Sequence, residues 1–285
     1  MAANLEGRVC MVTGATSGHG RAVATGLARQ GAHVVLLGRN PEKCRAVQRE
    51  IAAENGGKAP DIVLCDLSSR SEIDRAASEY LASGRPLHVL VNNAGLVNLK
   101  RRETGDGVEM VFAVNYLAYF QLALRLLPRL RDSAPARIVN VSSDTHKIAK
   151  LDLDDLELCR RYSWLRSYGR SKLAIVYFTL ELARRLEGTG VTVNAVDPGP
   201  VASSIGDNNP GPVYTLLAPL IRGLFPSPER AARTALYLAG NPELETTSGA
   251  YYKFMKRRIP KVRSDEPEFG KQLWERSAAM TGVDL

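Results

Sequence analysis

The 285-residue sequence contains few of the residues that build metal centres and disulfide frameworks. It has four cysteines, Cys10, Cys44, Cys65 and Cys159, with no CxxC pair among them, and only four histidines. Ligands so few and so scattered argue against a zinc site and against a fold held together by disulfides. We therefore expect reduced, packed thiols and no bound metal.

A clean hydrophobic run long enough to cross a bilayer is also absent. The longest apolar stretch, VFAVNYLAYFQLALRLL from Val111, is interrupted by Asn115, Gln121 and Arg125. It predicts a buried helix rather than a span of about 20 apolar residues. The first residues show no basic segment followed by an apolar one, so no signal peptide is expected. With the scarcity of cysteine, these features predict a cytoplasmic protein.

Acidic residues are outnumbered, with 30 Asp and Glu against 38 Lys and Arg and a net charge of +8. Part of the excess is local, because residues 253–263 read KFMKRRIPKVR, with six cations and no acid. No nucleic-acid-binding module is recognisable, so we predict no nucleic-acid partner. The basic segment is either a solvated surface or a patch that attracts phosphate-bearing ligands or membrane lipids.

Short apolar runs alternate with helical stretches along the whole chain, which is typical of parallel strands covered on both faces. The alternation predicts one α/β domain, residues 1–285, with a doubly wound parallel sheet of about seven strands and helices on both faces. The strand candidates are Val9–Thr13, His33–Leu37, Ile62–Cys65, Leu87–Val91, Arg137–Val141, Val191–Val196 and Ala250–Phe254. The helical candidates are Gly20–Gln30, Pro41–Ala53, Ser69–Ser83, Gly105–Arg131, Leu165–Glu187 and Pro228–Ala239.

Two segments stand outside this rhythm. Residues 199–227 are rich in proline and glycine, and a long irregular segment in a compact domain is often a lid or binding loop. We predict a substrate lid there and a basic C-terminal extension over residues 253–285. The apolar residues of the lid indicate a bulky apolar substrate, or they pack a short lid helix; they are Val213, Tyr214, Leu216, Leu217, Leu220, Leu224 and Phe225.

The first strand candidate leads directly into TGATSGHG, residues 13–20, which follows the pattern TGxxxGxG. Glycines in such a turn let the backbone approach a pyrophosphate, and the helix that follows offers N–H groups and its dipole. The position between a strand and an amphipathic helix makes a dinucleotide site the preferred interpretation. The residues predicted to line it are Gly14, Thr16, Ser17, Gly18, His19 and Gly20.

The end of the second strand candidate, LLGRN, bears on the choice of cofactor. Gly38 stands where an acid would bind the ribose 2′-hydroxyl of NAD, and Arg39 follows it. A cation suits a 2′-phosphate, so we predict a preference for NADP(H) over NAD(H), with a plain surface arginine as the alternative. Asn40 is included in this site. Asp66, next to Leu67, is either an acceptor for the adenine amino group or a helix N-cap.

The chemistry is predicted at the ends of the fourth and fifth strand candidates, near the topological switch of such a sheet, where ligands bind. The fourth strand candidate ends VNNAG and the fifth ends VNVSS, while Tyr168 and Lys172 are four residues apart on one helix face. An ammonium near a tyrosine lowers the pKa of its hydroxyl and makes it a usable acid–base group. A YxxxK pair alone is a weak signal, but the ordered set of glycine turn, NNAG, serine and YxxxK is specific.

TGATSGHG, VNNAG, FAVNYLAYF, NVSS, YGRSK and DPGPV, in this order, resemble the motif series of the short-chain dehydrogenase/reductase family over nearly the whole chain. PARIVNVSSDTHK and RYSWLRSYGRSKLA are similar to its retinol-dehydrogenase-like branch. The resemblance implies a Rossmann-type domain that transfers hydride between a nicotinamide and the carbon of a small-molecule alcohol, ketone or aldehyde. It also implies homodimers or homotetramers.

By resemblance, Tyr168 is the general acid/base, and Lys172 binds the nicotinamide ribose and lowers the pKa of Tyr168. Ser143, or the adjacent Ser142, holds the substrate oxygen. Asn115 anchors a proton-relay water, although an asparagine there can also bond its own helix backbone. The other cofactor contacts that the resemblance implies are Asn93, Ala94, Gly95, Pro198, Gly199, Val201 and Ser203.

Two departures from the family pattern are visible. His19 stands where Ile or Leu is usual, either as a packing change or as an electrostatic influence on the site. Ser143 and Tyr168 are 25 positions apart, about twice the usual spacing, and the insertion over residues 144–162 is expected to form a pocket wall. The alternative function is a non-catalytic NADP(H)-binding sensor or scaffold, although such proteins lose the tyrosine or the lysine.

Overall fold

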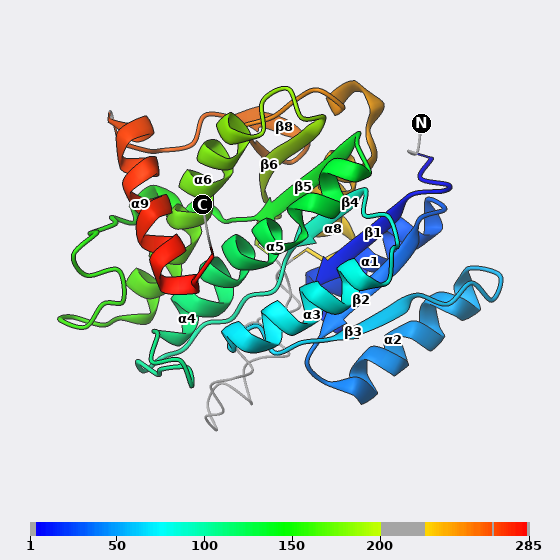
Figure 1. Ribbon diagram of the computed structural model, residues 1–285, viewed down its shortest axis with the longest axis horizontal. Coiled ribbons are helices and arrows are strands. Elements are labelled where there is room, and N and C mark those ends of the chain that lie inside the picture. Colours follow the sequence, from blue (N-terminus) through cyan, green and yellow to red (C-terminus); the bar gives the residue numbers. More distant parts are fainter. Residues whose placement is uncertain (1–3, 201–225, 264, 284–285) are drawn as a thin grey trace.

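The computed structural model describes residues 4–200, 226–263 and 265–283. They form one sheet between two layers of helices (Figure 1), with the strand order β3-β2-β1-β4-β5-β6-β7-β8. The strands are β1 (Val9–Thr13), β2 (His33–Gly38), β3 (Asp61–Leu64), β4 (Val89–Asn92), β5 (Ala136–Val141), β6 (Val191–Asp197), β7 (Ala250–Lys253) and β8 (Lys256–Arg258). The α-helices are α1 (Gly18–Arg29), α2 (Pro41–Glu54), α3 (Arg70–Ala82), α4 (Met110–Phe112), α5 (Ala118–Asp132), α6 (Trp164–Arg185), α8 (Pro228–Gly240) and α9 (Glu266–Thr281).

Alternate residues of the strands enter two hydrophobic cores, one on each side of the sheet. In β1, Val9 and Met11 belong to the core that α3, α5, α6 and α9 cover. Cys10 and Val12 belong to the core beneath α1, α2 and α8. Both faces are therefore buried, which explains why the strands read as continuous apolar runs rather than as an apolar–polar alternation.

The expected doubly wound, Rossmann-type architecture is confirmed, with each strand candidate present to within about two residues. The sheet reverses its winding between β1 and β4, which are neighbours although β2 and β3 lie between them in sequence. Such a switch point is where open α/β sheets bind ligands. The expected number of strands was about seven and the structure has eight, because β8 folds back antiparallel on β7.

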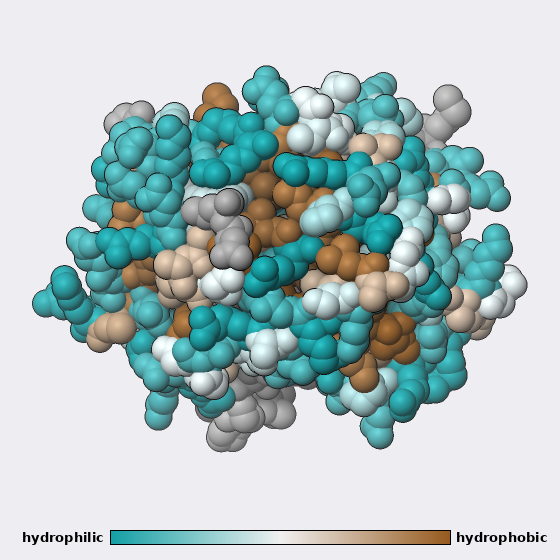
Figure 2. Space-filling view, in the orientation of Figure 1, coloured by the Kyte–Doolittle hydropathy of each residue, from teal (hydrophilic) through white to brown (hydrophobic). Residues whose placement is uncertain are grey.

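One helix was not predicted. Helix α9 lies in the stretch that the sequence suggested as a basic extension, and it packs on α5 and α6. The ring centroids of Phe269 and Tyr177 are 4.9 Å apart, as are those of Trp274 and Phe120. Figure 2 shows the face formed by these helices, hydrophilic around its rim with apolar side chains in the middle, between α5 and α6.

The apolar stretch from Val111 forms a continuous helix, Met110–Asp132, that includes a π-helical segment, η1 (Ala113–Leu117). By length and composition it is the one helix of the described residues that could cross a membrane, but 78% of its most apolar window is buried inside the protein. It packs as a core helix, in agreement with the expectation from its interrupted sequence. The thiols of Cys10, Cys44 and Cys65 are free and buried, whereas that of Cys159 is free and exposed, so the expectation of packed thiols is wrong for Cys159.

Candidate active site

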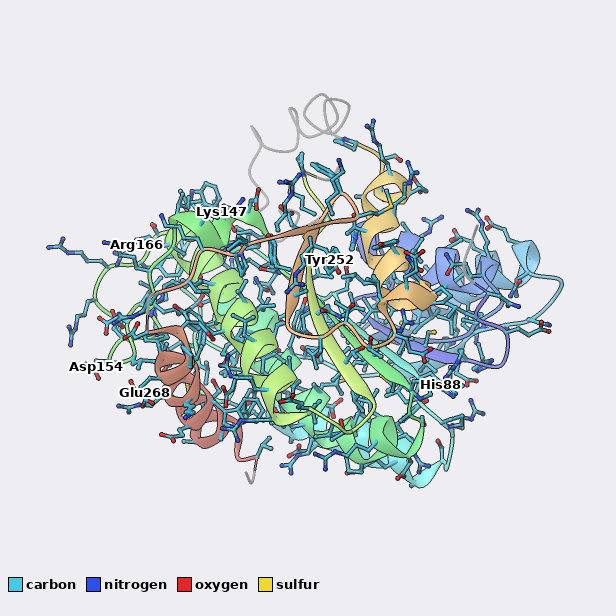
Figure 3. All side chains as sticks on the ribbon, turned by 90° about the horizontal axis from the view of Figure 1, so that it is seen from above. His88, Lys147, Asp154, Arg166, Tyr252 and Glu268 are labelled. Carbon is cyan, nitrogen blue, oxygen red and sulfur yellow. The ribbon has the colours of Figure 1, made fainter. Side chains whose placement is uncertain are left out.

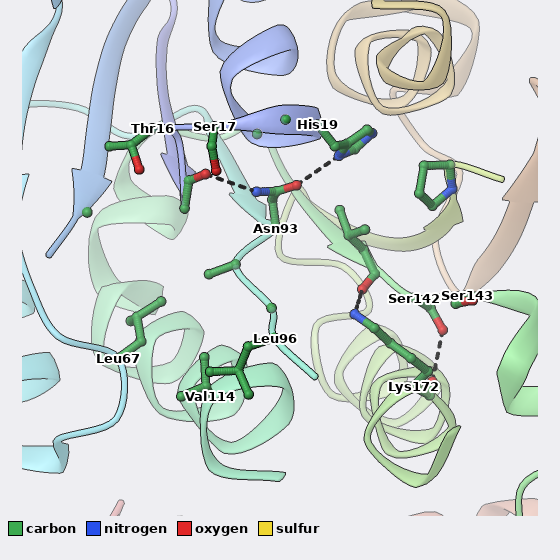
Figure 4. A pocket seen from close by; sticks show the side chains of 18 of the residues that line it. Thr16, Ser17, His19, Leu67, Asn93, Leu96, Val114, Ser142, Ser143 and Lys172 are labelled. Atoms are coloured by element: carbon green, nitrogen blue, oxygen red, sulfur yellow. Dashed lines mark hydrogen bonds between the residues drawn. The ribbon is translucent and has the colours of Figure 1, made fainter. Parts of the chain in front are cut away.

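An open cavity of about 880 Å³ lies at the carboxyl ends of the parallel strands, beside the switch point (Figure 4). Its volume is in the range of cofactor and ligand sites. The predicted site residues that line it are Gly14, Thr16, Ser17, Gly18, His19, Gly20, Arg39, Asn40, Asp66, Leu67, Asn93, Ala94, Gly95, Ser143, Tyr168, Lys172, Pro198 and Gly199. Asn115 lies behind the lining. Val201, Ser203 and the rest of the expected lid up to residue 225 lie outside the described residues.

The glycine turn forms a cradle that side chains would fill. A Cβ atom on Gly14, whose φ is +63°, would lie 2.9 Å from Ala94 Cα. A Cβ on Gly20 would overlap Asn93 Nδ2 and the carbonyl oxygen of Gly14. Helix α1, which starts at this turn, has no acidic residue in its first turn, so no local carboxylate opposes the positive end of its dipole. The turn therefore fits the pyrophosphate of a dinucleotide.

A network of three side chains connects this turn to the end of β4. Thr13 Oγ1 accepts hydrogen bonds from the backbone N–H groups of Asn93, at 2.8 Å, and Ala94, at 3.0 Å. Asn93 Nδ2 donates to the carbonyl oxygen of Thr13, so Asn93 Oδ1 is left to accept from His19 Nδ1, at 2.8 Å (Figure 4). Burial lowers the pKa of His19, which favours the neutral ring. Thr13 was not among the predicted residues, although it opens the TGxxxGxG motif.

Two cations face the cavity beyond the end of β2. Arg39 and Lys43 both line it, and both are exposed. Asn40 lies between them and caps α2, because its Oδ1 accepts from the backbone N–H of Lys43 at 2.9 Å. Lys43 was not among the predicted residues, although it follows Arg39 by four positions.

Of the two roles expected for Asp66, the structure contradicts the helix N-cap. Its Oδ1 accepts hydrogen bonds from the backbone N–H of Ser68, at 2.9 Å, and from Ser68 Oγ, at 2.8 Å. This closes a local turn. The N-cap of α3 is Ser69, whose hydroxyl accepts from Glu72 N. Asp66 still lines the cavity, so a contact with adenine remains a prediction.

Tyr168 and Lys172 meet at the opposite end of the cavity. Lys172 Nζ lies 5.5 Å from the centroid of the Tyr168 ring and donates to Val141 O at 2.9 Å. Burial lowers the pKa of Lys172 to about 7, against the opposing effect of the Asp197 carboxylate. Burial and then Asp197 raise the pKa of Tyr168 to about 12, against a hydrogen bond with Ser143. The expected lowering of the Tyr168 pKa is therefore not found, because desolvation dominates.

The two serines at the end of β5 point in different directions. Ser142 Oγ donates to the carbonyl oxygen of Lys172 at 2.8 Å, so this hydroxyl fastens β5 to α6. Ser143 is hydrogen-bonded to Tyr168 and lines the cavity with it. Ser143 also caps the short 3-10 helix η2 (Asp144–Ile148) by accepting from Thr145 N at 3.3 Å. Of the two serines, Ser143 is the one placed to meet a substrate oxygen beside the tyrosine.

Asn115 is fully buried in the π-helical segment η1 and bonds residues outside its own helix. Its Oδ1 accepts from Leu96 N at 2.8 Å, while its Nδ2 donates to Leu96 O at 3.0 Å and to Ser171 Oγ at 3.2 Å. The side chain thus clamps the loop after β4 to α6. A π-helical turn at a functional site is a recurrent feature, because the wider turn re-aims a side chain.

A buried acidic residue near Tyr168 was missed. Asp197, the last residue of β6, lies 2.9 Å from Lys253 Nζ on the neighbouring strand β7. Lys253 also pairs with Asp144 at 2.6 Å. Burial alone would raise the pKa of the Asp144 carboxyl, but pairing with Lys147 and Lys253 lowers that pKa to about 2. These ion pairs join the ends of β6 and β7 to η2, and Asp144, Asp197 and Lys253 all line the cavity.

The insertion between Ser143 and Tyr168 contributes only its first residues to the cavity. Asp144 and Thr145 line the wall. Farther along, Tyr162 OH donates to Asn98 O at 2.7 Å, so this part packs on the loop after β4.

Comparison with known proteins agrees with this arrangement. The family model of short chain dehydrogenases matches residues 8–210. Human retinol dehydrogenase 13 is 38% identical to this chain over 287 residues, which cover 99% of this chain and 87% of the relative. Human polyprenol dehydrogenase is 40% identical, with 97% of this chain and 86% of the relative covered.

Solved structures share the fold. An uncharacterized protein from Mycobacterium paratuberculosis superposes with a TM-score of 0.77 at 30% identity, over 99% of this chain and 96% of the other. An active-site complex of Pseudomonas aeruginosa RhlG with NADP has a TM-score of 0.69 at 29% identity, over 88% and 96% of the two chains.

Proposed function

Since the chain belongs to the short-chain dehydrogenase family, in its retinol-dehydrogenase-like branch, we propose that it interconverts an alcohol and a carbonyl on a bulky apolar small molecule with NADP(H). Membership makes the protein an alcohol/carbonyl oxidoreductase; the cofactor preference, the substrate and the residue roles are our proposals. One observation carries them: Ser143, Tyr168 and Lys172 face the same cavity as the glycine cradle.

The cradle and its neighbours would hold the cofactor along the cavity. The backbone between Gly14 and Gly20 and the start of α1 would bind the pyrophosphate. Arg39 and Lys43, which both line the cavity beyond the end of β2, would bind the 2′-phosphate through charge-assisted contacts. When bound, the nicotinamide supplies or accepts the hydride.

The protein groups at the other end handle the substrate oxygen and its proton. Ser143 donates a hydrogen bond to the oxygen and polarises the carbonyl. Tyr168, with a pKa raised to about 12, is protonated at neutral pH and donates its proton to the oxygen as hydride arrives at the carbon. In the reverse direction the phenolate takes the alcohol proton. When protonated, Lys172 stabilises the phenolate, and the nearby Asp197 carboxylate favours that protonated form.

The proposed substrate class rests on two supports. The relatives at 38% and 40% identity are named for retinol and polyprenol, which are long apolar alcohols. The segment predicted as a lid is rich in large apolar residues. We therefore expect isoprenoid or similarly bulky aldehydes and ketones to be reduced better than small polar ones.

The test is a carbonyl panel, from retinal and shorter isoprenoid aldehydes to sugar-like ketones, followed by NADPH absorbance with NADH in parallel. Tyr168→Phe is expected to lose a factor of about 100 or more in kcat. Tyr162→Phe removes a hydroxyl from the neighbouring insertion and should keep most of the activity. Near-normal turnover by Tyr168→Phe would refute the mechanism. NADPH binding without turnover of any substrate would instead support a sensor or scaffold.

A further inference from the structure

The turn at the tip of the β7–β8 hairpin carries two bulky apolar residues that a turn of this kind does not require. Lys253 pairs with Lys256, so Phe254 and Met255 form a two-residue turn, with φ of +51° and +58°. Two positive φ angles characterise the hairpin turn that favours Asn-Gly. Bulky side chains are rare in this left-handed region, and such strain is found at functional positions.

The tip also leaves apolar surface in solvent. Phe254 is 56% exposed, Met255 is 39% exposed, and Ile259, just after β8, is 94% exposed. The tip lies at the mouth of the cavity, because the Phe254 ring approaches Gly199, where a Cβ would meet it at 3.2 Å. An exposed cluster of this kind marks an interaction site more often than a fold requirement.

Several cations flank these apolar residues. Lys253 is paired with Asp144 and Asp197, and Arg263 with Asp265. Within the described ranges, no Asp or Glu forms an ion pair with four other exposed cations of this segment. They are Lys256, Arg257, Arg258 and Lys261.

The combination of cations and exposed apolar side chains on the hairpin favours one class of partner over the others. A second copy of this chain, added antiparallel to β8, would set Lys256, Arg257 and Arg258 against the same three cations, which is repulsive. A nucleic acid would engage the cations but has no use for the exposed aliphatic side chains of Met255 and Ile259. The interface of an anionic bilayer takes both, with phosphates for the cations and acyl chains for the apolar groups.

We propose that the β7–β8 hairpin docks the protein on anionic lipid bilayers, with Phe254, Met255 and Ile259 entering the interface and residues 256–258 on the headgroups. The hairpin is held firmly enough for this role, because Met255 N donates to Thr234 Oγ1 on α8 and Lys261 N donates to His146 Nε2 on η2. Figure 3 shows β7, marked by Tyr252, and η2, marked by Lys147, from above. Docking here turns the cavity mouth toward the membrane. The proposal goes beyond the enzymatic function and does not depend on it.

The first experiment is cosedimentation of the full-length protein with phosphatidylcholine vesicles, with and without phosphatidylserine. We expect binding to the anionic vesicles only. The triple variant K256Q/R257Q/R258Q should bind them about 100-fold more weakly, at about five-fold for each removed charge. The matched control, R45Q/R49Q/K58Q, removes three exposed cations at the opposite edge of the sheet and should bind as the unsubstituted protein does.

The second experiment separates docking from folding. The variant F254N/M255G places the preferred residues of this turn at the tip, so its Tm should stay the same or rise. Its affinity for anionic vesicles should nevertheless fall at least about ten-fold, because the buried apolar area at the interface is lost. A falling Tm with unchanged vesicle binding would show that the tip serves the fold and would overturn the proposal.

Other results would also overturn the proposal. They are equal binding to both kinds of vesicle, an equal loss in the control variant, or stronger binding to a duplex oligonucleotide than to anionic vesicles at the same salt. Turnover of a water-soluble carbonyl is measured alongside. If the unsubstituted protein turns over no carbonyl, this result counts against the enzymatic function and does not affect the conclusion about vesicle binding.

Discussion

Lys172 Nζ lies 5.5 Å from the centroid of the Tyr168 ring and 2.9 Å from Val141 O, to which it donates a hydrogen bond. The cation is thus held against the face of the tyrosine and the end of β5 at the same time. Both side chains contribute to one cavity wall. The Asp197 carboxylate acts to raise the pKa of each, in the same direction as burial for Tyr168 and against burial for Lys172. The charges of the three groups are therefore coupled.

Removing the negative charge of Asp197 should shift the pH dependence of alcohol oxidation toward lower pH. With its pKa raised to about 12, Tyr168 is an acid at neutral pH, so alcohol oxidation should accelerate as pH rises while carbonyl reduction does not. Asp197→Asn removes a cause of the raised pKa, so the rise in oxidation rate should start at lower pH. Profiles of kcat/KM test this, with the exposed carboxylate variant Asp154→Asn as control. An unchanged profile in Asp197→Asn would contradict the coupling.

The buried lysine should leave a signature in stability. Burial lowers the pKa of Lys172 from 10.5 to about 7, so between these values the unfolded chain binds more protons than the folded one. Stability should therefore rise with pH across this window, by at most about 1.4 kcal/mol per pH unit. Lys172→Met removes this slope. The free energy of unfolding of the variant, compared with that of the unsubstituted protein, should therefore be most favourable near pH 7 and become less favourable as pH rises above 7. Urea unfolding at several pH values measures both slopes, and parallel slopes would rule the effect out.

Two cations should set the cofactor preference. Arg39→Met and Lys43→Met should each weaken NADPH binding at least about ten-fold, because each removes a charge-assisted contact to the 2′-phosphate. NADH lacks that phosphate, so its affinity should change little. Titration calorimetry without substrate gives the affinities directly. The control is Arg45→Met, which lies on the same helix as Lys43 but outside the cavity lining. A tighter complex with NADH than with NADPH in the unsubstituted protein would refute the cofactor assignment.

His19 should stabilise the cofactor cradle through Asn93. His19→Leu leaves Asn93 Oδ1 without its hydrogen bond and should cost about 1–3 kcal/mol of stability at neutral pH. Because burial lowers the pKa of His19 below 6.5, the unsubstituted protein should lose stability as pH falls through 6.5 and below, and the leucine variant should not. The difference between them should thus shrink on acidification. Thermal unfolding at neutral and acidic pH measures it; a constant difference would mean that the ring does not titrate.

The glycine cradle should not accept a methyl group. A Cβ on Gly20 would overlap backbone at Gly14, so Gly20→Ala should destabilise the protein by about 1–3 kcal/mol and weaken NADPH binding. Gly105→Ala is a suitable control, because no atom lies within 4 Å of its added Cβ and its φ is not in the left-handed region. Equal stability and affinity in the two variants would show that the close approach at Gly20 is not needed.

Much of the fold could be predicted from the order of residues, because its signals are local. Short apolar runs form strands when both faces of a sheet are covered, so β1 and β6 were found nearly to the residue. The cofactor turn and the Tyr168–Lys172 pair were also visible, since each is a fixed spacing within one element. Helix α9 also had a local signal in the spacing of Phe269, Leu273 and Trp274, but the basic residues before it favoured the interpretation of a C-terminal extension.

What could not be predicted depends on residues distant in sequence. Asp197 and Lys253 become partners only because β6 and β7 are neighbours in register. The choice between Ser142 and Ser143 follows from which hydroxyl bonds the backbone of α6 and which bonds Tyr168 in the cavity. The pKa of Tyr168 differs from the expectation for the same reason. Desolvation and Coulomb interactions depend on burial and on distances through space, whereas the motif YxxxK specifies only that two side chains share a helix face.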